Sequence, residues 1–231
     1  RMFLKSYFMK SNEKFSLDNK KEDSFKAQAF PDQKLLDHLK VDFNKFEEIV
    51  KNWETMQDFI NLNKQTNFVK THNAMCTVGS YQFTSPRNTK GAIYVVRDPR
   101  DVLVSLSHHM GCDYDQTFEH LSSSYNFEYP SSGNKRYKKS LMGKWSDHYK
   151  SWKNYKKSKV LIIKYEDMVS SELDTFSKII SYLNEIDDTN FYKEKIHKAV
   201  EQTKFEELQK MEKKEGFIEK GKGKLFLRKG K

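Results

Sequence analysis

The sequence has few cysteines and no long apolar segment. Its 231 residues include two cysteines, Cys76 and Cys112, which provide neither a disulfide framework nor a metal-binding spacing. No run of about 18 apolar residues occurs, so we expect no membrane-spanning helix. The apolar stretch within residues 1–6 is too short for a secretory signal. Together these absences predict a cytoplasmic protein whose two thiols stay reduced.

The histidines do not have the spacing of a metal site. His108 and His109 are adjacent, so on a helix their side chains diverge and cannot hold one ion in the usual i, i+4 manner. His120 and His148 have no paired carboxylate or cysteine ligands at tetrahedral spacing. We therefore predict that the protein uses no metal.

Basic residues outnumber acidic ones, and the formal net charge is +10. Such an excess suits nucleic acid, an anionic surface or a polyanionic small ligand. The lysines are spread along the whole chain and cluster only at 220–231, which is typical of a solvated surface. We therefore expect no nucleic-acid partner. With 36% hydrophobic and 14% aromatic residues, the chain has enough apolar material to build a core.

Short apolar, β-branched runs alternate with helical patterns along the chain. The runs predict three buried strands, at 66–71, 92–97 and 160–165. The helical patterns cover 2–9, 33–49, 52–62, 100–110, 141–156, 170–185, 189–200 and 203–213. This alternation predicts an α/β fold with a mostly parallel sheet, in a single domain over residues 1–231.

The segment 94–106 combines a strand, a turn and the start of a helix. An apolar run ends at Arg97, and an Asp-Pro dipeptide then opens a helix that carries Ser105 eight residues after the arginine. This order brings Arg97 and Ser105 to the same edge of a parallel sheet, where doubly wound folds bind anions and nucleotides. A guanidinium at that edge can offer a planar fork to a phosphate. From this segment alone, a structural ion pair of Arg97 with Asp98 or Asp101 explains the pattern equally well.

Four segments along the chain carry polar residues at the ends of predicted strands or near the C-terminus. They are Phe68–His72 (Phe-Val-Lys-Thr-His), Val96–Ser105, Val160–Met168 with its Tyr-Glu-Asp, and Phe226–Gly230 with its Arg-Lys-Gly. In this order the segments resemble the sulfotransferase family, bacterial members included. That family transfers a sulfuryl group from 3′-phosphoadenosine 5′-phosphosulfate (PAPS). The resemblance runs from residue 1 to 231 and includes further matches at Trp145–His148 with Trp152 and at 203–217. It implies a P-loop-like parallel sheet flanked by helices, the sulfotransferase fold.

The resemblance also implies parts that this sequence does not contain. The family's loop for the 5′-phosphosulfate, a turn of the Pro-Lys-Ser-Gly type, would lie just before Arg1 together with the first strand of the sheet. The family's continuation past Arg-Lys-Gly would follow Lys231. We therefore expect a fragment that is inactive by itself, and that self-associates because a strand edge is exposed.

Two residues on the first of these segments have the chemistry for transfer. Sulfuryl transfer needs in-line geometry and stabilisation of the charge on the leaving oxygen. Histidine, with an ordinary pKa of about 6.5, is the right type of group to take the proton of an acceptor hydroxyl, and the resemblance gives this general-base role to His72. Lys70 lies two residues earlier, so on a strand both side chains point to one face, where its ammonium can neutralise developing charge. Without the flanking motifs, His72 reads as a hydrogen-bonded histidine at a strand end.

The resemblance implies a separate set of residues for the nucleotide. For the 3′-phosphate it implies Arg97, Ser105 and Arg228, with further charge from Lys229 and a backbone N–H from Gly230. Two guanidinium forks and a hydroxyl at the 3′-phosphate would distinguish PAPS from ATP.

The adenine ring is the other part of the nucleotide that needs contacts. The resemblance implies Tyr165 and Thr203 as adenine contacts, and it places Phe3 where a tryptophan usually stacks on the base. The plain alternative for Tyr165 is a core aromatic at the end of a strand. The expected acceptor is the hydroxyl, or an amine, of a small molecule, glycan or lipid. Its pocket would be lined by aromatic residues: Tyr81, Phe83, Tyr125, Phe127 and Tyr129.

Two other functions fit parts of the sequence. A P-loop nucleotide kinase or other NTPase would share the sheet and its anion-binding edge, but the chain lacks the Gly-x-x-x-x-Gly-Lys-Ser/Thr motif. A basic, non-enzymatic binding protein would explain the net charge and the lysine-rich end. It gives no reason for the Lys-Thr-His motif or for the spacing of Arg97 and Ser105.

Overall fold

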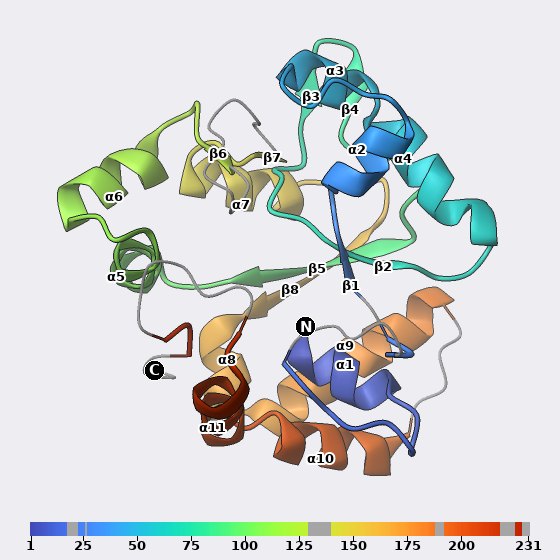
Figure 1. Cartoon of the computed structure of the whole chain (residues 1–231), viewed down its shortest axis with the longest axis vertical. Coiled ribbons are helices and arrows are strands. Elements are labelled where there is room, and N and C mark those ends of the chain that lie inside the picture. The colour runs from blue at the N-terminus through green and yellow to red at the C-terminus, as the bar shows by residue number, and fades with distance from the viewer. Residues whose placement is uncertain (18–22, 26, 129–139, 188–191, 218–224, 228–231) are drawn as a thin grey trace. The chain divides into compact units, whose positions relative to one another are not determined.

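Strands β5 (Gly91–Val96) and β8 (Lys159–Lys164) pair with each other. The computed structural model describes residues 1–17, 23–25, 27–128, 140–187, 192–217 and 225–227 (Figure 1). These residues form two compact units. The first unit consists of Arg1–Lys26, Val95–Asp113 and Ile163–Lys231, and the second of Ala27–Tyr94 and Tyr114–Ile162. The single-domain organisation stays a prediction.

The three strands expected from the apolar runs are all present. They are β2 (Phe68–Lys70), β5 (Gly91–Val96) and β8 (Lys159–Lys164). β5 pairs with β8, and β2 pairs in parallel with β1 (Ala27–Ala29), with Ala29 opposite Lys70. The expectation that these strands are buried is wrong: most of their residues are half-buried, and Val95 is 49% exposed. Among the described residues, each of these strands pairs with one other strand, so no further strand is described at its second edge.

Short strands that the apolar pattern did not predict complete the second unit. β1 is one of them; the others are β3 (Thr77–Val78), β4 (Tyr81–Gln82), β6 (Phe127–Glu128) and β7 (Ser140–Leu141). β3 and β4 form an antiparallel pair, as do β6 and β7. Pairs of two residues carry too little apolar alternation to be recognised from sequence.

The second unit has a core of large apolar side chains, to which several of its helices contribute. The helices are α2 (Gln33–His38), α3 (Phe46–Lys51), α4 (Trp53–Ile60), the 3₁₀ turn η1 (Asn61–Asn63), α6 (Tyr114–Ser122) and α7 (Trp145–Lys153). The core includes Leu36, Ile49, Trp53 and Met56, each fully buried, and Trp152 from α7 packs on the same cluster. α7 is therefore fixed to the core of this unit through one large ring.

The helix predicted over 33–49 is interrupted, and the cause is local. Lys40 adopts a left-handed conformation with φ 56°. Its N–H donates to the carbonyl of Asp37, and the N–H of Val41 donates to the carbonyl of Leu36. These two bonds are the pattern that closes a helix at its C-terminal end, usually with glycine at the left-handed position. The sequence has lysine there, so the apolar periodicity alone did not predict the end of α2.

The first unit is mainly helical. Its elements are α1 (Met2–Phe8), α5 (Pro99–Met110), α8 (Tyr165–Ser170), α9 (Glu172–Asp187), α10 (Lys193–Gln202) and α11 (Phe205–Glu215). α10 lies against both α1 and α9 (Figure 1). Phe176, Ile179, Ile180 and Leu183 are buried at the i, i+3, i+4, i+7 spacing, which makes one face of α9 apolar. A second cluster joins α11 to the segment after α1 through Phe15, Leu17, Leu208 and Phe217.

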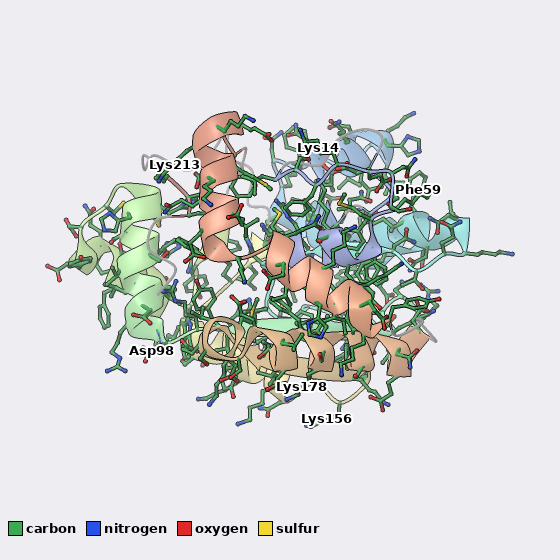
Figure 2. The ribbon with its side chains drawn as sticks, turned by 90° about the horizontal axis from the view of Figure 1, so that it is seen from below. Lys14, Phe59, Asp98, Lys156, Lys178 and Lys213 are labelled. Atoms are coloured by element: carbon green, nitrogen blue, oxygen red, sulfur yellow. The ribbon has the colours of Figure 1, made fainter. Side chains whose placement is uncertain are left out.

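The segment 94–106 folds as its sequence predicts, with a strand followed by a helix. The Asp98 carboxylate accepts from the N–H of Arg100 and caps α5, and Pro99 occupies the first helical position. Asp98 is labelled at this end of the helix in Figure 2. At the other end Gly111 has φ 69° and its N–H donates to the carbonyl of Ser107. Within the described part of the chain, no helix combines the length and apolar character needed to cross a bilayer.

Candidate functional site

Lys70 and His72 lie at the carboxyl end of β2. Lys70 is the last strand residue, and its carbonyl oxygen accepts from the N–H of Phe30, 2.8 Å away, which extends the pairing of β1 and β2. Lys70 is half-buried and His72 is exposed. β2 ends at Lys70, so His72 lies in the loop that follows the strand. The position of the imidazole therefore depends on how this loop is held.

Asn73 fixes the start of that loop from inside the second unit. Its side chain is fully buried, and its Oδ1 accepts from the N–H of Leu141 at 2.7 Å. The N–H of the next residue, Ala74, donates to the carbonyl of Leu141 at 2.8 Å. Trp152 on α7 donates from Nε1 to the carbonyl of Asn73 at 3.0 Å. Buried groups that are hydrogen-bonded on several sides hold a loop in one conformation.

α7 contacts the same loop at two more places. The N–H of Met75 donates to Ser151 Oγ at 3.0 Å. The ring of His148 lies with Nε2 at 3.1 Å from the carbonyl oxygen of His72, and with Nδ1 at 2.9 Å from the hydroxyl oxygen of Tyr94. Burial lowers the pKa of His148 and raises the pKa of Tyr94 to about 12. Both side chains are therefore neutral near pH 7.

Arg97 and Tyr165 meet in the first unit, each directly after its strand. The guanidinium carbon of Arg97 lies 4.3 Å from the centre of the Tyr165 ring, over its face. Nε of Arg97 lies 4.0 Å from a carboxylate oxygen of Asp101, an exposed side chain one helical turn away. The N–H of Asp98 donates to Oε1 of Glu166 at 3.0 Å, which ties the two strand ends together. This bond is the main reason that the pKa of Glu166 is lowered.

The Asp98 carboxylate is engaged with Arg100. Its Oδ2 lies 2.6 Å from Nη2 of Arg100, and Oδ1 accepts from both Nε and the backbone N–H of the same residue. These bonds hold the pKa of Asp98 at about 2. Of the two carboxylates that the sequence offered to Arg97, the structure thus places Asp101 beside the arginine at the limit of ion-pair distance, while Asp98 pairs with Arg100.

The remaining sequence-predicted nucleotide contacts occupy different surroundings. Ser105 is exposed on α5. Thr203 is half-buried after α10 and donates from Oγ1 to the carbonyl of Ala199 at 2.7 Å. Phe3 is 3% exposed and stacks on Phe176, with 4.0 Å between ring centroids. Phe3 is therefore a core residue in this structure, and its role as an adenine contact stays a prediction that the packing does not favour.

The Arg228-Lys229-Gly230 motif lies outside the described residues, but the residues before it are held by a buried carboxylate. Glu212 on α11 is 3% exposed. Its Oε1 accepts from the N–H of Phe226 at 2.6 Å, and its Oε2 accepts from the N–H of Leu227 at 2.8 Å. Gln209 also donates from Nε2 to the carbonyl of Leu227. The backbone that leads to Arg228 is thus attached to α11.

Sequence reasoning missed four residues that organise these sites: Tyr94, His148, Glu166 and Glu212. His148 was weighed only as a metal ligand and as part of the Trp145–His148 match, because a pattern of residues does not show which backbone carbonyl a side chain will reach. Glu166 belongs to the Tyr-Glu-Asp match, which was the signal available for it. Among the described residues, no group of three or more histidine, cysteine, aspartate or glutamate side chains is placed to hold a metal ion.

Comparison with known proteins gives one family and several solved structures. The family model described as the sulfotransferase domain matches residues 7–231. A crystal structure of retinol dehydratase with androsterone and the inactive cofactor PAP is similar, with a TM-score of 0.51, 22% identity, and coverage of 75% of this chain and 49% of that chain. The structure of mouse sulfotransferase SULT7A1 complexed with PAP is also similar, with a TM-score of 0.52 and 21% identity. The match covers 75% of this chain and 60% of that chain. The chain thus spans about half the length of these proteins, and the likeness confirms the predicted fold class. No curated protein sequence matches the chain.

Proposed function

Since the chain belongs to the sulfotransferase domain family, we propose that the full-length protein transfers a sulfuryl group from PAPS to an acceptor hydroxyl or amine. The observation that supports this proposal most directly is the pairing of Arg97 with the face of Tyr165 at the ends of β5 and β8. Stacking uses the face of the guanidinium, while its N–H groups point outward in the plane and suit the oxygens of a phosphate. The family match also favours this activity over a nucleotide kinase and over a basic binding protein.

The nucleotide in this proposal is recognised through its second phosphate. Arg97 and Ser105 would bind the 3′-phosphate, with Arg228, Lys229 and Gly230 covering it from the C-terminal segment. Tyr165 and Thr203 would contact the adenine, and the Tyr165 ring lies against the Arg97 guanidinium that would bind the phosphate. PAP, adenosine 3′,5′-bisphosphate, is the nucleotide bound in the two similar crystal structures, and it is the product that PAPS leaves after transfer.

The chemical step in this proposal uses His72 and Lys70. His72 takes the proton from the acceptor hydroxyl, whose oxygen forms a bond to sulfur as the bond from sulfur to the 5′-phosphate oxygen breaks. The negative charge that develops on that phosphate oxygen is stabilised by the Lys70 ammonium. The products are the sulfated acceptor, adenosine 3′,5′-bisphosphate and a proton on His72. None of these residues needs a metal ion for its role.

The acceptor in this proposal is a small molecule with an apolar body. α6 exposes Tyr114 and Phe118, which are 55% and 62% accessible and lie one helical turn apart, and Tyr125 follows at 85%. Tyr125 is one of the aromatic residues that the sequence analysis expects to line the acceptor pocket. One similar protein was crystallised with androsterone, a steroid alcohol. Free thiols at Cys76 and Cys112 support the further proposal that the protein works in the reducing cytoplasm.

The direct test is transfer of radiolabelled sulfate from PAPS by the full-length protein, with steroid, phenol and sugar acceptors compared. We expect a labelled, chromatographically separable product that forms only when the protein, PAPS and an acceptor are all present. Calorimetry should show strong binding of adenosine 3′,5′-bisphosphate and poor binding of adenosine 5′-phosphate. Equal affinity for the two nucleotides, or absence of a labelled product with every acceptor, would contradict the proposal.

A further inference from the structure

The imidazole of His148 joins three elements of the second unit. His148 lies on α7, its Nε2 is 3.1 Å from the carbonyl oxygen of His72 after β2, and its Nδ1 is 2.9 Å from the hydroxyl oxygen of Tyr94 in β5. The rings of Tyr94 and His148 also lie near each other, with 5.6 Å between centroids. Both ring nitrogens are therefore occupied by partners within the second unit.

These partners determine where the proton of the imidazole lies. A backbone carbonyl can only accept, so Nε2 of His148 must carry the hydrogen that bonds to His72. Burial lowers the pKa of His148, which leaves Nδ1 without a proton near pH 7. The Tyr94 hydroxyl, whose pKa is raised to about 12 by burial, is protonated and donates to Nδ1. The result is a directed chain from the Tyr94 hydroxyl through His148 to the His72 carbonyl.

The bonded carbonyl belongs to the residue whose side chain is proposed to act as the base. On one side of His72, Lys70 is held by pairing with β1; on the other, Asn73 is fully buried and bonded to Leu141 and Trp152. His72 itself is exposed, so core packing does not orient it. The bond from His148 thus anchors the backbone of His72 directly.

We propose that His148 is a positioning residue that fixes the backbone of His72, and that Tyr94 keeps the His148 ring in the orientation and tautomer this requires. The proposal rests on the assignment of His72 as general base in the proposed function. A general base works only within hydrogen-bond reach of the proton it removes, and a displacement of about 1 Å can cost about 100-fold in rate. A rigid anchor at the His72 carbonyl limits such displacement.

The first test reads the tautomer and does not depend on activity. Long-range proton–nitrogen NMR correlations on the full-length protein with labelled histidine distinguish a protonated nitrogen from a bare one. We expect the His148 ring to be neutral near pH 7, with the hydrogen on Nε2. A hydrogen on Nδ1, or a charged ring at that pH, would overturn the proposal even if the protein showed no transferase activity. Absence of transfer with the expected tautomer would instead contradict the proposed function.

The second test separates turnover from binding. His148→Leu removes both hydrogen bonds and should lower kcat by about 10- to 100-fold while the KM for PAPS stays within about threefold. His148→Gln places an amide nitrogen near the position of Nε2 and should recover most of kcat. Tyr94→Phe removes only the hydroxyl and should lower kcat by less than His148→Leu does.

The same substitution at another histidine of the second unit is the control. His38 lies on α2 and packs against the ring of Phe59, with 4.7 Å between centroids. His38→Leu should retain the kcat of the wild type. If His148→Gln loses as much kcat as His148→Leu, or if both mainly raise the KM for the acceptor, His148 acts on the substrate and the positioning role is wrong.

Discussion

Arg97 and Tyr165 are far apart in sequence, but the guanidinium carbon of one lies 4.3 Å from the ring centre of the other. Each residue directly follows a strand, Arg97 after β5 and Tyr165 after β8, and pairing of these strands brings the two strand ends together. Asp98 follows Arg97 and Glu166 follows Tyr165, and the N–H of Asp98 donates to the Glu166 carboxylate. The strand-end geometry therefore fixes both the cation and the aromatic ring that the proposed nucleotide site requires.

Replacing Arg97 tests the phosphate contact. Arg97→Ala in the full-length protein should weaken the binding of adenosine 3′,5′-bisphosphate by about 2–4 kcal/mol, because a charge-assisted contact in a partly desolvated site is removed. Calorimetry measures the effect. Arg100→Ala is the matched control, since it removes the same charge from an exposed side chain that pairs with Asp98. A loss as large for Arg100→Ala would mean that general charge, and not a specific contact, holds the nucleotide.

Replacing Tyr165 tests the ring that supports the arginine. Tyr165→Leu removes the aromatic face and should weaken binding of the same nucleotide by about 0.5–2 kcal/mol, the range of a cation–π contact. Tyr165→Phe keeps the ring and should retain most of the affinity. Fluorescence or calorimetric titration of both variants gives the comparison. Equal losses in the two variants would show that the hydroxyl, and not the face of the ring, carries the contribution.

The sequence predicted the parts of the fold that rest on short apolar, β-branched runs and on polar residues at strand ends. β2, β5 and β8 and the α5 helix with its Asp-Pro start were all recognised in this way. The helix boundary at Lys40 was not, because a left-handed lysine carries no signal of the kind that glycine gives. α6 was not predicted, although its Tyr114 and Phe118 have helical spacing.

The candidate site was predictable only where a side chain is the functional group itself. Arg97 and Tyr165 were assigned from the resemblance, and the structure brings them together. His148 acts through a backbone carbonyl, and such contacts depend on tertiary packing that no local pattern encodes. Phe3 shows the opposite case, because an aromatic chosen for an adenine role packs instead on Phe176 in the core.

Removing His72 tests the catalytic assignment. His72→Ala should lower turnover of PAPS by about 100- to 10,000-fold while leaving the affinity for adenosine 3′,5′-bisphosphate nearly unchanged, because a general base acts on the acceptor. Lys70→Ala should also lower turnover, through lost stabilisation of the charge on the leaving phosphate. Steady-state kinetics and calorimetry on the same preparations separate the two effects. More than about a tenth of the wild-type turnover in His72→Ala would be too much for a residue acting as the base.

The buried ion pair of Lys5 and Asp23 provides a prediction about stability. Nζ of Lys5 lies 2.7 Å from a carboxylate oxygen of Asp23, and the two side chains are 1% and 5% exposed. Lys5→Met should lower the free energy of unfolding by about 3–5 kcal/mol, because it removes a cation that lies against a buried carboxylate. The double variant Lys5→Met with Asp23→Leu should recover much of this loss.

Lys45→Met is the control, because Lys45 and Asp42 form an exposed pair at 3.5 Å that should contribute about 0–1 kcal/mol. Chemical denaturation of the three variants measures each difference, and similar losses for Lys5→Met and Lys45→Met would show that burial of the first pair has no energetic consequence.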